Sequence, residues 1–187
     1  SEPVEPTAEE YEVYGAAVWE VFTGPYQRVE GARRDSIPAG VYVFTTREAG
    51  LAQVFDSSIH DAAGVDSSAL RNYVAVNQGD FELEPRVPGI GQQVTLSRRE
   101  VAELFAEEGW EGFDRRYPDA VGLVGLSRVG FSDDGQSALV FVSRYQGGLN
   151  GEGTKTVNFR LKIESTVLED GSSSAASMLF FIEHKSI

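Results

Sequence analysis

The residues best suited to nucleophilic chemistry in this chain lie together in one short segment, 57–61. Ser57, Ser58, His60 and Asp61 supply the residue types of a hydrolytic triad. Triad members normally meet from separate segments, and neighbours in an extended stretch point to opposite sides. The G-x-S-x-G turn that exposes a catalytic serine is also missing from the sequence. We therefore interpret the segment as a polar loop and predict no catalytic residue.

The sequence also lacks the usual signatures of metal and nucleotide sites. There is no cysteine, and the two histidines, His60 and His184, are too far apart for metal-ligand spacing. The glycine-rich segment QGGLNGEG at 146–153 has no P-loop lysine, and its Glu152 would repel a phosphate. The acids at 133–134 lack the spacing and closing glutamate of a calcium-binding EF-hand. We expect neither a metal nor a cofactor.

Three residues remain as candidates for ligand binding: Arg128, Trp110 and Tyr117. Arg128, in LSRVGF, is the one charged residue of a segment that is patterned as a strand. We expect its guanidinium either to pair with an acid from the first helix or to bind a ligand carboxylate. Trp110 and Tyr117 recur with Phe113 about once per helical turn. Such spacing is typical of a helix that packs on a core, and the alternative is the wall of a ligand pocket.

The composition narrows the choice of partner. The formal net charge is −13, and so acidic a surface repels both the phosphates of nucleic acids and anionic membranes. No apolar run reaches the length of a transmembrane helix. We therefore expect no nucleic-acid binding and no membrane insertion, which leaves an unknown protein or small molecule as the partner.

Three capping signals predict where helices begin. Thr7 with Glu10, and Ser97 with Glu100, form capping boxes, and Asp66 is suited to cap a third helix. Glycine and proline mark the ends of these helices. The predicted helices run from Thr7 to Gly24-Pro25, from Asp66 to Gly79, and from Ser97 to Gly109 with a continuation to Pro118.

Strands are predicted on both sides of these helices. Segment 40–50 is rich in β-branched and aromatic residues, whereas prolines and glycines make 81–93 a loop or a broken edge strand. From Gly122 onward apolar residues alternate, with turn signals at 132–136, 147–153 and 169–174. Gly135 is expected to supply a positive φ in the first turn. We predict an α+β fold, with N-terminal helices packed on one face of a C-terminal antiparallel meander of about four strands.

Two glutamates and two prolines dominate the first residues of the chain, SEPVEP. We predict a flexible segment over 1–6 and a single α+β domain over 7–187. The composition is typical of the spacer that follows a cleaved signal or lipid-anchor segment. An exported location is therefore expected, and a cytoplasmic location is the alternative.

A longer sequence pattern supports the same location. The pattern W-x2-F-x3-YP-x3-G at 110–122 is followed by LSRVGF at 126–131, the strand ALVFV at 138–142 and the glycine-rich turn at 147–153. Together with the helix EYEVYGAAVWEVF at 10–22, it resembles a family of uncharacterised bacterial proteins of the cell envelope or secreted fraction. The resemblance implies a fold and a location but no activity. This chain departs from the family at its end, where SMLFFIEHKSI lacks the usual tryptophan.

The sequence thus favours an exported α+β domain that acts by binding or as an envelope-associated structural or interaction protein. The alternatives are a hydrolase or isomerase that uses acids such as Asp61 or Glu183, and a small-ligand carrier, each with a helix-lined, sheet-backed cavity. A deep pocket lined by Trp110, Tyr117 and a buried acid would favour these alternatives. A filled core without a cleft would favour the first hypothesis.

Overall fold

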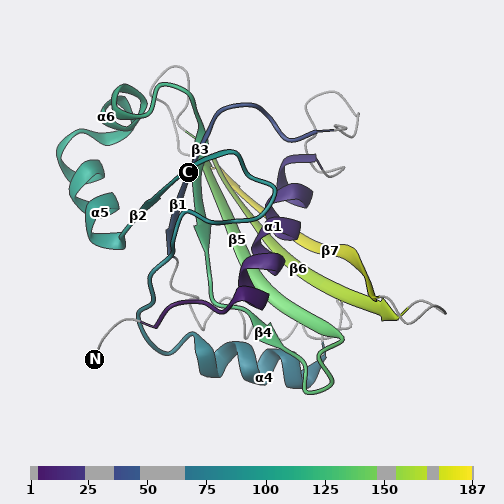
Figure 1. Ribbon diagram of the computed structural model, residues 1–187. Coiled ribbons are helices and arrows are strands. Elements are labelled where there is room, and N and C mark those ends of the chain that lie inside the picture. Colours follow the sequence, from purple (N-terminus) through teal and green to yellow (C-terminus); the bar gives the residue numbers. More distant parts are fainter. Residues whose placement is uncertain (1–3, 24–35, 47–65, 147–154, 168–172, 187) are drawn as a thin grey trace.

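The computed structural model describes residues 4–23, 36–46, 66–146, 155–167 and 173–186 of the chain (Figure 1). These residues form helices and strands in one connected arrangement, which confirms the predicted α+β class. The helices are α1 (Ala8–Thr23), α4 (Ser67–Val76), α5 (Arg98–Glu107) and α6 (Gly109–Arg116). The strands are β1 (Val41–Thr46), β2 (Gln92–Leu96), β3 (Ala120–Leu126), β4 (Gly130–Phe131), β5 (Ser137–Gln146), β6 (Lys155–Val167) and β7 (Ser173–Ser186).

The strands form one mixed sheet in the order β2-β1-β3-β5-β6-β7, and the short β4 also pairs with β5. β1 is parallel to both β2 and β3, whereas the pairs β3-β5, β5-β6 and β6-β7 are antiparallel. The sheet is therefore mixed and larger than the antiparallel meander that the sequence predicts. β1 pairs with β3 in parallel, and β2 forms the edge of the sheet beside β1. β2 escaped prediction because it is short and follows a segment interrupted by proline and glycine.

Helices cover both faces of the sheet, which corrects the prediction of a single covered face. On one face, α1 packs on β1, β3 and β5, and Figure 1 shows it lying across β5 and β6. On the other face, α5 and α6 pack on β1 and β3, and α4 packs on β5. Both faces need cover because consecutive residues of these strands are apolar, and successive side chains point to opposite sides. The α1 face carries Tyr42, Phe44, Val124, Leu126, Val140 and Val142, and the opposite face carries Val43, Leu123, Leu139 and Phe141.

The helix starts follow the predicted capping chemistry. In α1, the Thr7 amide donates to Glu10 Oε2 at 2.8 Å and the Glu10 amide donates to Thr7 Oγ1 at 3.3 Å. Ser97 and Glu100 form the second capping box at the start of α5. Asp66 Oδ1 accepts hydrogen bonds from the Ser68 and Ala69 amides at the start of α4. These side chains bind amides that have no partner inside the helix.

The turn between β4 and β5 is the hairpin that the sequence predicts. Gly135 has φ of +68°, and the Ser132 amide donates to the Ser137 carbonyl at 2.8 Å. Asp134 Oδ1 accepts from the Gln136 amide at 3.0 Å and from Ser132 Oγ at 2.6 Å. A side chain thus satisfies the backbone of the turn, as expected of aspartate in such loops. The predicted turn at 147–153 and residues 169–172 of the predicted turn at 169–174 lie outside the described residues.

The chain contacts the rest of the fold from Val4 onward. Val4 forms an isolated parallel bridge with Phe81, Glu5 forms an ion pair with Arg86, and Pro6 is buried. These contacts join residues 4–6 to the segment around Phe81 and Arg86. None of the described helices combines the length and hydrophobicity needed to cross a membrane.

Candidate functional site

Arg128 lies in the irregular segment 127–129 between β3 and β4, not inside a strand as predicted. The backbone of Arg128 is hydrogen-bonded to the side chain of Asn77 and not to a neighbouring strand. Asn77 Oδ1 accepts from the Arg128 amide at 2.9 Å, and Asn77 Nδ2 donates to the Arg128 carbonyl at 3.1 Å. The preceding Ser127 carbonyl accepts from the Tyr14 hydroxyl at 3.0 Å. This corner of the sheet is therefore held by side chains from α1 and from the end of α4.

The Arg128 guanidinium forms a bidentate ion pair with Glu10 of α1. Arg128 Nε and Nη2 donate to Glu10 Oε1 and Oε2 at 2.7 and 2.8 Å, and the Val129 amide donates to Oε1 at 3.0 Å. Arg128 is 9% exposed and Glu10 is 2% exposed. The hydrogen bonds to Glu10 raise the pKa of Arg128. Arg128 thus pairs with an acid of the first helix, which is the structural alternative predicted from the sequence.

Trp110 belongs to an aromatic cluster at the junction of α5 and α6. Its ring centroid lies 4.8 Å from that of Phe105 and 5.4 Å from that of Phe113, both in edge-to-face geometry. Phe113 is buried and lies 5.4 Å from Tyr117. Tyr117 and Trp110 are both partly buried against the same core cluster, but only Trp110 also lines an open cleft. Only one of the two aromatic candidates therefore lines this cleft.

We call this depression the aromatic cleft. It has a volume of about 490 Å³ and lies between α5, the start of α6 and the sheet, beside the carboxyl end of β1. Phe105, Trp110 and Tyr145 provide aromatic surface, and Gly125 adds no side chain to the floor. Its described lining residues are Thr45, Thr46, Arg98, Val101, Ala102, Phe105, Trp110, Leu123, Gly125 and Tyr145.

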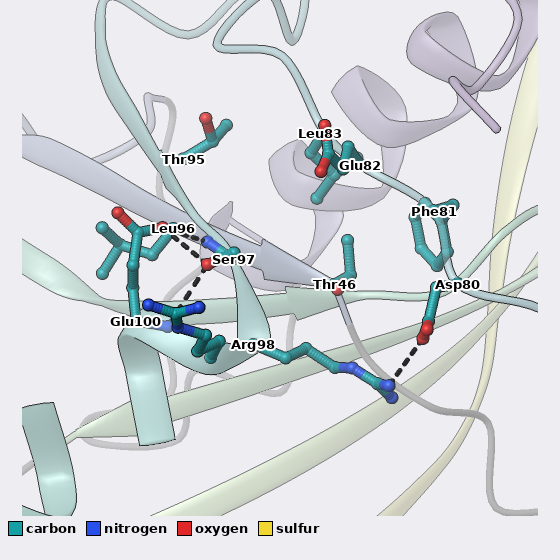
Figure 2. A pocket seen from close by; sticks show the side chains of 11 residues that line it. Thr46, Asp80, Phe81, Glu82, Leu83, Thr95, Leu96, Ser97, Arg98 and Glu100 are labelled. Carbon is teal, nitrogen blue, oxygen red and sulfur yellow. Dashed lines mark hydrogen bonds and ion pairs between the residues drawn. The ribbon is translucent and has the colours of Figure 1, made fainter. Parts of the chain in front are cut away.

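A second depression, which we call the polar cleft, shares Thr46 and Arg98 with the aromatic cleft. It too has a volume of about 490 Å³. Figure 2 shows the Arg98 side chain extended toward Asp80, on the side that Thr46 and Phe81 also line. Arg98 Nη2 lies 2.7 Å from Asp80 Oδ1. Arg98 therefore stands at the boundary of the two clefts, with its guanidinium bound to a carboxylate.

Thr45 carries an unsatisfied hydroxyl beside the aromatic cleft. It alternates with Phe44, so its side chain lies on the α5 face of β1 with that of Val43, and it lines the cleft. Thr45 is 7% exposed, and its Oγ1 has no hydrogen-bond partner among the described residues. A buried hydroxyl without a partner costs about 1–3 kcal/mol. Native proteins contain few such groups.

The sequence did not single out most of the residues that line the aromatic cleft. Arg98 forms a doublet with Arg99, a pattern typical of a solvated helix face, and Thr45 carries no signal of its own. Phe105 could be assigned to a helix but not to a cleft. His60 and Asp61 lie outside the described residues, as do the side chains of Glu183 and His184. In the described part of the chain, no group of three or more acids or histidines is placed to hold a metal ion.

Comparison of the chain with protein-family models, with curated protein sequences and with solved structures finds no match.

Proposed function

We propose that this chain is a ligand-binding domain that holds a compact aromatic molecule in the aromatic cleft. The observation that carries the proposal is the lining of this cleft, where three aromatic rings stand beside a few polar groups. Small-molecule sites have this composition, and their volumes fall between about 300 and 1,000 Å³. The position of the cleft agrees with it, since ligands of open sheets with parallel strands commonly bind beyond the carboxyl ends of those strands.

The described side chains of the cleft favour binding over catalysis. A hydrolase or isomerase needs a group that exchanges a proton near neutral pH, such as a carboxylate or an imidazole. The described lining offers instead threonine and tyrosine hydroxyls and one arginine, which hold and orient a ligand. The small-ligand carrier, which was an alternative from the sequence, is therefore the more specific form of the binding hypothesis. The acidic N-terminal segment and the pattern at 110–153 support an exported or envelope-associated location for this carrier.

Binding can be measured with N-phenyl-1-naphthylamine, an uncharged aromatic probe whose fluorescence rises in apolar surroundings. Ala102 lines the cleft from α5, and Ala106 lies one turn later on the exposed surface of the same helix, outside the described lining. Ala102→Phe fills the cleft, whereas Ala106→Phe is the matched control. We expect the native chain and Ala106→Phe to bind the probe and Ala102→Phe to lose most of this binding.

A second signal locates the probe. The chain has two tryptophans, and Trp19→Phe leaves Trp110 in the cleft wall as the only donor for energy transfer. We expect the bound probe to quench Trp110 in this variant. Equal probe binding by Ala102→Phe and Ala106→Phe, or no binding by the native chain, would reject the proposed function.

A further inference from the structure

We infer that the ligand of the aromatic cleft is an aromatic carboxylic acid, with its ring against Trp110 and its carboxylate on Arg98. This inference rests on the proposed function and specifies the chemical class of the ligand. Three features of the clefts carry it: the position of Arg98, the carboxylate that Arg98 already holds, and the unsatisfied hydroxyl of Thr45.

Arg98 is the one charged residue among the described residues that line the aromatic cleft. Because it also lines the polar cleft, its side chain lies where an aromatic cavity meets a polar one. A guanidinium offers paired N–H donors that match the two oxygens of a carboxylate. A molecule with an apolar ring and an anionic end would therefore place its ring against the aromatic cleft and its anionic end against Arg98.

Asp80 shows that Arg98 is positioned to bind a carboxylate at this boundary. Its Oδ1 lies 2.7 Å from Arg98 Nη2, but the Asp80 side chain is 80% exposed. Ion pairs this exposed are weak, so a competing carboxylate can replace Asp80 with little loss. The replacement exchanges one charge-assisted pair for another and leaves Asp80 in water. The resident pair thus keeps the arginine extended until the ligand arrives.

Thr45 supplies an independent reason for a polar substituent on the ligand. Thr45 lines the same cleft, and its buried hydroxyl has no partner among the described residues. A hydroxyl donates one hydrogen bond and accepts others, so a carboxylate oxygen or a ring hydroxyl would satisfy it. A purely hydrocarbon ligand would leave this group unsatisfied.

Competition between two matched ligands tests the inference. In the native chain we expect 1-naphthylacetate to displace the bound probe about tenfold more effectively than 1-naphthylacetamide, a ratio typical of one hydrogen bond to a charged group. Arg98→Met keeps the apolar stem of the side chain but removes its charged guanidinium. This variant should lose the preference for the acid while it binds the amide as before. Arg115→Met is the control, because Arg115 pairs with Glu108 on α6 and is absent from the described lining of both clefts.

Asp80→Asn gives a change in the opposite direction. It removes the competing carboxylate, so 1-naphthylacetate should bind more tightly, by up to about fivefold, and the amide should be unaffected. An equal response of acid and amide in the native chain, or a preference that survives Arg98→Met, would overturn the inference about the carboxylate. The proposed function would still stand in that case, because the uncharged probe and the Ala102→Phe variant test it separately.

Discussion

Glu10 and Arg128 form a buried ion pair between residues that lie 118 positions apart in the sequence. The pair fixes α1 to the corner where the chain passes from β3 to β4. The Glu10 carboxylate also accepts hydrogen bonds from the Thr7 and Val129 amides. The same side chain therefore caps a helix, neutralises an arginine and satisfies the backbone of the sheet corner. Because this arginine is occupied inside the fold, we place the proposed carboxylate site at Arg98, whose ion pair with Asp80 is exposed.

Removal of Arg128 should destabilise the fold strongly. Arg128→Met leaves the Glu10 carboxylate buried without its cation, and we expect the free energy of unfolding to fall by about 3–5 kcal/mol. Arg128→Lys keeps the charge but not the bidentate geometry, so its loss should be smaller. Urea denaturation of both variants at pH 7 measures the difference. A stable Arg128→Met protein would show that the pair does not hold α1 to the sheet.

Gly130 is a position where the backbone of β4 meets α4 directly. A Cβ at Gly130 would lie 2.3 Å from the Tyr73 nitrogen and 2.4 Å from its Cα, so the helix would have to move. We expect Gly130→Ala to lower the free energy of unfolding by about 1–3 kcal/mol. Gly79→Ala, where a Cβ meets nothing within 4 Å, is the control and should change stability little. Similar losses for the two variants would contradict the close approach of α4.

A substitution at Gly135 tests backbone strain alone, because a side chain at this position would not collide with its surroundings. Its φ is +68°, and a Cβ there would meet no atom within 4 Å. Gly135→Val should therefore cost about 1 kcal/mol or more through conformation alone. Asparagine tolerates positive φ better, so Gly135→Asn should cost less. Equal unfolding midpoints for the native chain and Gly135→Val would place this glycine in an ordinary conformation.

The unsatisfied hydroxyl of Thr45 is expected to lower the stability of the unliganded protein and to strengthen ligand binding. Thr45→Val replaces a buried, unsatisfied oxygen with a methyl group, so the unliganded protein should gain about 1 kcal/mol. The same variant should bind 1-naphthylacetate more weakly than the native chain does. Thermal unfolding and probe displacement provide the two measurements. A loss of stability would mean that the hydroxyl already has a partner within the fold.

Acid should weaken the contact between α4 and the hairpin turn. Hydrogen bonds from Arg71 and Asn72 lower the pKa of Asp133 below its ordinary value of 3.8. A carboxyl whose pKa is lower in the folded state stabilises the fold above its unfolded pKa, and this contribution disappears as the pH falls through the folded value. The difference in unfolding free energy between the native chain and Asp133→Asn should therefore shrink between about pH 5 and pH 2.

Asp114→Asn, an exposed substitution on α6, provides the control for general effects of charge on this acidic protein. A difference between the native chain and Asp133→Asn that stays constant across the acid range would exclude titration of Asp133 as its source.

Local chemistry made the helices and the hairpin predictable. Capping residues such as Thr7, Asp66 and Ser97 act within a few positions of the amides that they bind, so their role is visible in the sequence. The order of the strands is different, because β1 pairs with β2 and β3 across long stretches of chain. The apolar residues of β1 suit both faces of a buried strand, but nothing in the segment specifies its partners. The mixed sheet could not be predicted for this reason.

The candidate site divides in the same way. The pairing of Arg128 with an acid of α1 followed from the cost of an unpaired charge in an apolar setting. The cleft instead depends on how α5 and α6 pack over β1, β3 and β5, which brings together Thr45, Trp110 and Tyr145 from distant segments. Each of these residues looks like an ordinary core or surface residue when read alone. Only the folded structure shows that these residues line one cleft.

The parallel pairing of β1 has a consequence for the synthesis of this protein on the ribosome. Val41 of β1 pairs with Ala120 of β3, which emerges roughly eighty residues later, a delay of about 4–16 s at 5–20 residues per second. Until residues 92–96 of β2 emerge, the apolar segment VYVFTT has neither of its strand partners, and until β3 emerges it has only one of them. An unpaired strand of this kind is a target for chaperones and a starting point for aggregation. We therefore expect the yield of folded protein in cells to depend on chaperone supply and on translation speed through residues 47–120.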